Sequence, residues 1–117
     1  MSHKERIVFL DRAAFTDAEL PIPAFDHNWS EYPATDPADV VPRLFWATTA
    51  ITHACPIDAD MIGQLHKLKR IVVTGPATVD AAACATRGVT LTRLPANALS
   101  GPGLIRLLES LVEGAAA

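Results

Sequence analysis

Hydrophobic and polar positions along the chain follow two different periods, and the changes of period predict five strands and four helices. Short apolar or alternating runs predict strands at residues 6–10, 27–34, 46–52, 69–75 and 89–96. Apolar residues at helical spacing predict helices at residues 35–45, 56–68, 79–88 and 100–114. Residues 11–25 hold one weak helical turn followed by two prolines, so we expect a connector there.

Capping residues mark the expected ends of these helices. Side-chain oxygens can accept from the free N–H groups of a first turn, and the expected N-caps are Thr35 or Asp36, Asp58, and Ser100. The expected stops are Gly88, in a left-handed conformation, and Gly114. The apolar stripes that would face the core include Val40, Val41, Leu44 and Phe45 in the first helix, and Leu104, Ile105, Leu108, Leu111 and Val112 in the last.

The alternation of strands and helices predicts the fold class. Parallel neighbours need right-handed crossovers, which place helices on both faces of the sheet. Five strands in 117 residues predict an α/β, flavodoxin-like three-layer sandwich with a five-stranded parallel sheet of order 2-1-3-4-5. Residues 27–34 would form an edge strand, and residues 1–117 a single domain.

Composition and charge exclude several classes of partner. Half of the residues are hydrophobic, 20% are charged and the net charge is −3, which is typical of a globular protein without a basic surface for nucleic acid. The sequence has no apolar run of the ~20 residues that cross a bilayer, and no signal peptide. We therefore expect a cytoplasmic protein without nucleic-acid or membrane partners. Cys55 and Cys84 are expected to be small core residues rather than a disulfide.

Ligands of open parallel sheets bind beyond the carboxyl ends of the strands, near the reversal of strand order. Three predicted loops meet that description, at residues 11–12, 52–55 and 74–78. Gly75 would allow backbone to approach a ligand closely, and a helix opening near Thr78 would offer N–H groups to an anion. A small carboxylate is the ligand that this loop would suit. The alternative is an ordinary strand-to-helix turn.

Other chemistry has weaker support in the sequence. The Gly-Pro-Gly run at residues 101–103 is not a dinucleotide-binding turn, because Arg106 stands where a third glycine is needed. A zinc site would need His53, Cys55, His66 and Cys84, but His53 and Cys55 alternate along an extended stretch and would point to opposite faces. We assign no catalytic, cofactor-binding or metal-binding residue.

Three stretches together resemble a known family. They are RIVFLDRAAF, VPRLFWATTAITHACPIDADMIGQLHKLKRIVV and TGPATVDAAACATRGVTLTRLPA, within residues 5–100. They resemble the N-terminal, substrate-binding part of D-isomer-specific 2-hydroxyacid dehydrogenases, with the glycerate dehydrogenase and hydroxypyruvate reductase branch closest. The most specific element is a strand, a glycine loop, Val-Asp, an alanine-rich helix, Arg-Gly and a short strand.

The resemblance implies a substrate-facing surface made of two loops. In the family, N–H groups near the glycine matched by Gly75 hold the substrate carboxylate. The substrate-binding residues implied by the resemblance are Thr52, His53, Ala54, Thr74, Gly75, Pro76 and Ala77. The chain departs from the family pattern at Pro76, Ala77 and Thr78, where the family has Thr or Asn followed by Asn. Pro76 also removes one backbone donor.

The resemblance also implies what the isolated chain lacks. The family uses NAD or NADP, bound by a second domain with a Gly-x-Gly-x-x-Gly turn, a substrate-binding arginine and a Glu–His pair. Reduction of a 2-oxo acid needs a held hydride donor and a proton donor, so we expect no cofactor site and no turnover in this chain alone. Three hypotheses remain: a stand-alone domain that binds a small 2-oxo or 2-hydroxy acid, half of a split dehydrogenase with a separate NAD-binding partner, and a self-associating module. A homodimer is an expected state, because the last helix could either cover its own sheet or pair with a second copy.

Overall fold

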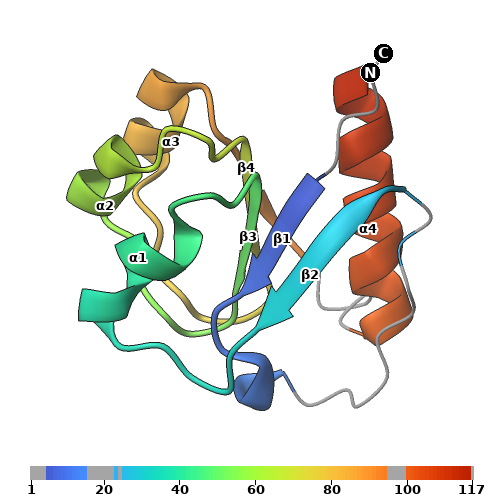
Figure 1. Cartoon of the computed structure of the whole chain (residues 1–117), viewed down its shortest axis with the longest axis horizontal. Coiled ribbons are helices and arrows are strands. Elements are labelled where there is room, and N and C mark those ends of the chain that lie inside the picture. The colour runs from blue at the N-terminus through green and yellow to red at the C-terminus, as the bar shows by residue number, and fades with distance from the viewer. Residues whose placement is uncertain (1–4, 16–22, 24, 95–99, 117) are drawn as a thin grey trace.

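The centre of the structure is a five-stranded parallel sheet (Figure 1). The structure is a computed structural model and describes residues 5–15, 23, 25–94 and 100–116. The strands are β1 (Glu5–Phe9), β2 (His27–Glu31), β3 (Thr49–Thr52), β4 (Arg70–Val73) and β5 (Thr90–Arg93). Their order is β2-β1-β3-β4-β5, with every neighbouring pair parallel. The predicted sheet order and the edge position of the second strand are confirmed.

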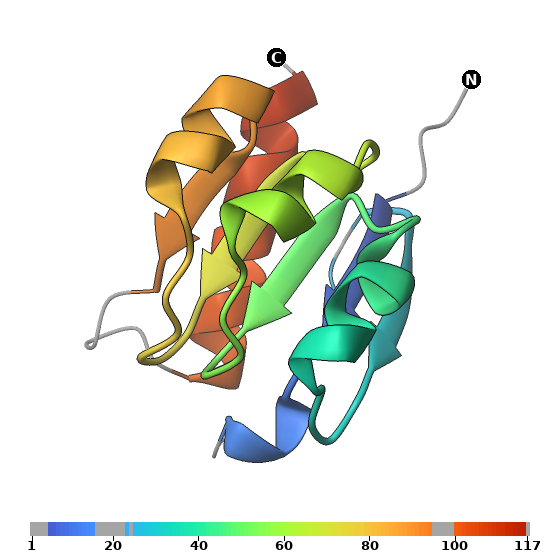
Figure 2. The same cartoon turned by 90° about the vertical axis from the view of Figure 1, so that its left-hand side faces the viewer.

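Helices cover both faces of this sheet and make three layers (Figures 1 and 2). The helices are α1 (Val40–Leu44), α2 (Ala59–Gln64), α3 (Ala81–Arg87) and α4 (Gly101–Ala116), with 3-10 turns at Arg12–Ala14 and Pro37–Asp39. The first three cover one face and α4 covers the other. The predicted α/β three-layer fold is confirmed. Within the described ranges, no helix combines the length and the apolar character needed to span a membrane.

Alternate side chains of a strand point to opposite faces of the sheet and belong to two separate hydrophobic clusters. Val8 points to the cluster under α1, α2 and α3, whereas Ile7 and Phe9 point to the cluster under α4. All residues of β3 and β4 are buried, as parallel strands covered on both faces require. Leu104, Ile105 and Leu108 of α4 are buried in the second cluster, so the stripe of the last helix covers the sheet of its own domain.

Three of the predicted helix boundaries are confirmed by their hydrogen bonds or backbone angles. The Asp58 carboxylate accepts from the N–H of Met61 at 2.9 Å. The Ser100 hydroxyl oxygen accepts from the N–H of Gly103 at 3.0 Å. Gly88 adopts the left-handed conformation, with φ of 73°, after the last residue of α3.

Other predictions for the helices are wrong. Residues 35–45 do not form one helix, because a 3-10 turn precedes the five-residue α1. Pro42 has no N–H to donate to the carbonyl four residues before it, so the α-helix does not extend further toward the N-terminus. Neither Thr35 nor Asp36 caps it, and the Thr35 hydroxyl instead donates to the Leu10 carbonyl at 2.6 Å. Phe45 lies beyond the end of α1 and is 42% exposed.

The end of the last helix also differs from the prediction. Gly114 lies inside α4, which continues to Ala116. A glycine weakens a helix interior by only about 1 kcal/mol relative to alanine, and the apolar face that precedes it is anchored on the sheet. Packing therefore outweighs the local propensity at this position.

A buried ion pair joins the amino ends of the strands. Arg70 of β4 donates to the carboxylate of Glu5 in β1 and to the Thr49 hydroxyl, and both charged side chains are 5% exposed. The Thr48 hydroxyl donates to the same Glu5 oxygen at 2.8 Å. Burial raises the pKa of Glu5, but the hydrogen bonds from Arg70 and Thr48, with the charges of Arg70 and Lys69, outweigh burial and hold the pKa below its ordinary value.

We expect Glu5→Gln to lower the free energy of unfolding by about 3 kcal/mol at neutral pH, because it leaves the Arg70 guanidinium buried beside a neutral amide. A carboxylate with a lowered folded-state pKa contributes stability above the ordinary pKa, and this contribution is lost as the pH falls through the lowered value. The difference between wild type and variant should therefore shrink in acid. Urea unfolding at several pH values measures it.

The matched control is Glu31→Gln, which removes a half-exposed partner of Arg12. This substitution should change the stability by no more than about 1 kcal/mol, since exposed ion pairs contribute little. If Glu5→Gln were as stable as wild type at neutral pH, the contribution assigned here to the buried Glu5–Arg70 pair would be wrong.

Candidate functional site

The three loops expected to carry ligands meet at the carboxyl edge of the sheet. Residues 11–12 follow β1, residues 53–55 follow β3 and residues 74–78 follow β4. Figure 2 shows the arrowheads of the strands pointing toward this edge. β1 and β3 are neighbours in the sheet, and the strand order reverses between them, so the loops lie where ligands of such sheets bind.

Asp11 ties the first loop to the second. One oxygen of its buried carboxylate accepts from the N–H of His53 at 2.7 Å, and the other accepts from Ala54 at 2.6 Å and Cys55 at 3.1 Å. The N–H groups of this loop are therefore bound to a carboxylate of the chain itself. The role of Asp11 was not predicted, although the only sequence signal for it, an acidic residue directly after a buried strand, is present.

The imidazole of His53 lies over Gly75. Its Nδ1 is 3.0 Å from the Thr74 hydroxyl oxygen, and its ring meets the Phe15 ring edge-on at 6.5 Å between centroids. A Cβ atom on Gly75 would lie 2.6 Å from Nε2 of His53. The glycine was expected to let a ligand approach the backbone, but the group that approaches it is the ring of His53.

Two of the four backbone N–H groups in the glycine loop, residues 74–78, are already bonded within the protein. The N–H of Thr74 donates to the Thr52 carbonyl and the N–H of Ala77 to the His53 carbonyl, each at 3.0 Å. Pro76 has no N–H. The N–H groups of Gly75 and Thr78 have no hydrogen-bond partner among the described residues, and the N–H of Gly75 is the one that lies beside the His53 ring.

The expected start of the following helix near Thr78 is wrong. α3 begins at Ala81 rather than near Thr78, because residues 78–80 pair with the segment after β3 through the bridge between Ile57 and Val79. The carboxylate of Asp80 then caps the helix and accepts from the N–H of Ala83 at 2.9 Å. A negative side chain already occupies this helix end.

The predicted site residues separate into an inner and an outer group. Thr52, Thr74 and Ala77 are buried, and the Thr52 hydroxyl donates to the Cys55 carbonyl at 2.7 Å, so this group shapes the loops. The outer group reaches the surface and consists of His53, Ala54, Gly75 and Pro76. A ligand at this edge would contact the outer group.

Two arginines that were not assigned to the site lie beside it. Arg93, the last residue of β5, donates to the Ala77 carbonyl at 3.3 Å. Arg12 lies near the Phe15 ring, 5.7 Å from its centroid, and forms an ion pair with Glu31 at 3.2 Å. Arg93 therefore brings a positive charge to the glycine loop, in a position that favours an anionic ligand.

A shallow hollow of about 510 Å³ adjoins the second loop. Its walls are mostly apolar and come from Asp11 and from residues 13–14, 33–35 and 54–56. Burial, with the negative charges of Asp11 and Asp36, raises the pKa of the Cys55 thiol that lines it. The thiol is therefore held in its protonated form and is a poor nucleophile.

The four residues considered for zinc do not gather. His53 faces Thr74 and Phe15, whereas Cys55 belongs to the cluster under the first three helices, so the two point to opposite sides as predicted. Cys84 is buried in α3, and His66 contacts Arg87 at 3.2 Å. Across the described parts of the chain, no three His, Cys, Asp or Glu residues come close enough to hold a metal ion.

One curated relative confirms the resemblance seen in the sequence. The chain is 35% identical over 89 residues to a protein of Haemophilus influenzae named "Putative 2-hydroxyacid dehydrogenase". The match covers 74% of this chain and 28% of that protein, so the chain spans less than a third of the relative's length. No protein-family profile matches the chain.

Solved structures show the same fold. A 3-phosphoglycerate dehydrogenase of Entamoeba histolytica with bound NAD⁺ superposes with a TM-score of 0.63, at 20% identity, over 82% of this chain and 34% of that one. An acyclic imino acid reductase in complex with NADPH and D-Arg gives 0.60, at 17% identity, over 77% of this chain and 31% of that one. At these identities the likeness concerns the fold.

We expect Gly75→Ala to lower the free energy of unfolding by about 1–3 kcal/mol, because the new methyl group collides with the His53 ring. The backbone itself accepts alanine, since Gly75 has no positive φ. The same substitution in a His53→Ala background should therefore cost much less. Chemical unfolding of the four proteins of this double-mutant cycle measures the coupling.

Gly63→Ala in α2 is the control, since nothing lies within 4 Å of the added Cβ. It should keep or raise the stability, by up to about 1 kcal/mol from helix propensity. Equal costs of Gly75→Ala with and without the His53 ring would contradict the packing described here.

Proposed function

We infer that this chain, a relative of the 2-hydroxyacid dehydrogenases, binds the carboxylate of a small 2-oxo or 2-hydroxy acid at the surface formed by His53, Ala54, Gly75 and Pro76. The observation that carries the proposal is the placement of the His53 imidazole over a glycine whose N–H is unpaired among the described residues. Two different donors then face one small region of the carboxyl edge.

The hydrogen-bond chemistry of the site suits a carboxylate. When the Thr74 hydroxyl donates to Nδ1 of His53, the neutral ring carries its hydrogen on Nε2 and can donate it to an acceptor. The N–H of Gly75 supplies a second donor, and the guanidinium of Arg93 adds a positive charge beside the loop. Hydrogen bonds to an ionised acceptor are stronger than those between neutral groups.

The fixed position of these groups supports recognition of a small ligand. Asp11 holds the N–H groups of residues 53–55, so the loop that carries His53 is set before a ligand arrives. Preorganised donors avoid the cost of ordering a loop on binding. The small side chain of Ala54 leaves room for the body of an acid such as glyoxylate or hydroxypyruvate.

Hydride transfer requires a part that these 117 residues do not contain. No Gly-x-Gly-x-x-Gly turn is present in the sequence, and the chain covers 28% of its dehydrogenase relative. We therefore propose that two units share the reaction. The described domain holds the acid, and a nicotinamide-binding unit, on a longer polypeptide or on a partner chain, supplies the hydride and the proton donor.

Titration of the ¹⁵N-labelled chain with glyoxylate should shift the amide resonances of Gly75 and Ala54 in a saturable way at millimolar concentrations. His53→Ala should weaken binding by at least about tenfold, as expected for losing a hydrogen bond to a charged group. His27→Ala is the control, because His27 lies in the edge strand β2 and should not matter. The absence of saturable shifts near these loops would remove the proposal.

The purified chain should not oxidise NADH in the presence of glyoxylate or hydroxypyruvate, because the residues that bind the acid hold no hydride donor. Absorbance at the nicotinamide band measures the rate. A longer polypeptide or a mixture with the cofactor-binding unit is the positive control. Turnover by the isolated chain that survives exhaustive purification would contradict the proposed sharing of the reaction between two units.

A further inference from the structure

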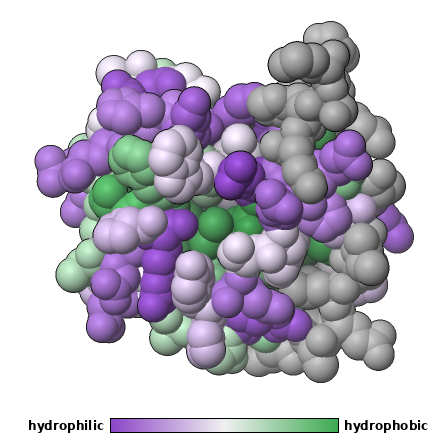
Figure 3. Space-filling model, in the orientation of Figure 1, coloured by the Kyte–Doolittle hydropathy of each residue, from purple (hydrophilic) through white to green (hydrophobic). Residues whose placement is uncertain are grey.

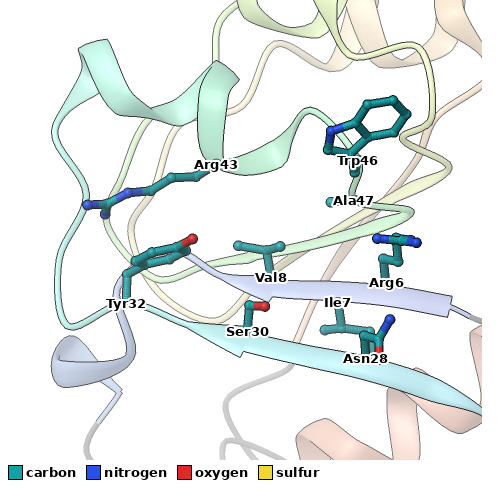
Figure 4. A pocket seen from close by; sticks show the side chains of 9 residues that line it. All are labelled: Arg6, Ile7, Val8, Asn28, Ser30, Tyr32, Arg43, Trp46 and Ala47. Atoms are coloured by element: carbon teal, nitrogen blue, oxygen red, sulfur yellow. The ribbon is translucent and has the colours of Figure 1, made fainter.

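A second concave surface lies at the open edge of the sheet, away from the carboxyl-edge loops (Figure 4). This groove has a volume of about 120 Å³ and runs between α1 on one side and β1 and β2 on the other. None of the loop residues 53–55 or 74–78 lines it. It is therefore distinct from the site assigned to the acid.

The groove results from incomplete cover of the sheet. Arg6 pairs in register with Asn28, and Val8 with Ser30, so these four side chains share one face of the two strands. Val8 lies in the cluster under the first three helices, which identifies this face as the α1 side. α1 has five residues, and Asn28 and Ser30 on the edge strand stay exposed.

An apolar floor lies between polar walls. Val8 and Ala47 are buried beneath the groove, and the indole of Trp46 stands beside it and is 61% exposed. Figure 3 shows hydrophobic surface at the bottom of a hollow near the centre of this view, bordered by hydrophilic residues. An exposed indole above an apolar floor offers a flat surface on which a ring can stack.

Arg43, at the far end of the groove, is held by a ring contact and two hydrogen bonds. The Arg43 guanidinium lies 4.0 Å from the centroid of the Tyr32 ring and donates to the Ala34 carbonyl at 2.8 Å and to the Thr35 hydroxyl at 2.7 Å. Arg43 is therefore already bonded within the protein and is less available to a ligand. Arg6, at the other end, is the cation that the groove can offer to a ligand.

The unpaired groups around the groove are rich in donors. Among the described residues, the side chains of Arg6, Asn28, Ser30 and Trp46 have no hydrogen-bond partner. A guanidinium and an indole N–H can only donate, while the amide and the hydroxyl can do either. None of the residues that line the groove is acidic, in a chain with net charge −3. This set of groups fits an anion.

We propose that the groove binds a small aromatic carboxylate, with the carboxylate on Arg6 and the ring between Trp46 and the floor formed by Val8 and Ala47. The groove volume of about 120 Å³ is below the roughly 150 Å³ of a cavity that encloses one benzene, so the ring would be only partly enclosed, with its outer edge in solvent. The groove is open on one side, which leaves the carboxylate near solvent and within reach of the exposed Asn28 and Ser30.

Titration of the ¹⁵N-labelled full chain with benzoate tests the proposal. The indole N–H resonance of Trp46, assigned with Trp46→Phe, and the amides of Asn28 and Ser30 should shift in a saturable way. Arg6→Gln should weaken binding by about tenfold or more, the expected effect of losing a charged donor. Benzamide, which has the ring without the charge, should give no saturable shift at the same concentrations.

Two control variants establish that the shifts arise from binding in the groove itself. Arg106→Gln removes an exposed arginine of α4, on the opposite face of the sheet, and should leave benzoate binding unchanged. His53→Ala should also leave the shifts in the groove unchanged, which keeps this test independent of the carboxyl-edge site. Arg6→Gln and Trp46→Phe alter exposed side chains, so both variants are expected to fold, and their amide spectra will show this.

Saturable shifts in the groove that depend on Arg6 support the proposal. It is overturned if these resonances do not move, if benzamide acts as well as benzoate, or if Arg6→Gln and Arg106→Gln have the same effect. Shifts confined to Gly75 and Ala54 also overturn it, and they would count instead for the acid site at the carboxyl edge.

Discussion

The carboxylate of Asp11 holds the candidate site together. Asp11 follows β1, and its side chain is buried. The carboxylate accepts hydrogen bonds from the N–H groups of His53, Ala54 and Cys55, which follow β3. A buried carboxylate without such donors is strongly disfavoured, and the loop without the carboxylate would leave one buried and two partly buried N–H groups unpaired. The carboxylate and the N–H groups of the loop therefore stabilise each other, and the position of His53 depends on this contact between the segments that follow two neighbouring strands.

The placement of His53 gives Gly75 its physical role. Gly75 has no positive φ, so its backbone conformation does not require glycine. The requirement comes from the His53 ring, which occupies the space where a side chain at position 75 would begin. The ring and the unpaired N–H of Gly75 then form one surface. This chain is similar to part of a putative 2-hydroxyacid dehydrogenase, and the preorganised pair of donors supports the proposal that the domain holds the acid while another unit carries the nicotinamide.

Uneven helix cover separates this site from the groove at the open edge. β3 and β4 are buried on both faces, and the loops that follow them are held by hydrogen bonds within the protein. The edge strand β2 carries exposed polar residues on its α1 side, because α1 has only five residues and does not cover them. The two surfaces use different residues, so ligands at one need not compete with ligands at the other.

The sequence by itself determined the fold: alternating strand and helix periods led to the parallel sheet of order 2-1-3-4-5, and the caps at Asp58, Gly88 and Ser100 followed from the residues next to each helix. It also indicated the three loops at residues 11–12, 52–55 and 74–78, since parallel strands end at one edge of the sheet. Only the tertiary structure decided which N–H groups of those loops are bonded within the protein and which are left for a ligand. Asp11 and Cys55 are 44 positions apart, and Glu5 and Arg70 are 65 apart. No periodic pattern encodes contacts at such separations, because they form only when the sheet brings distant segments together.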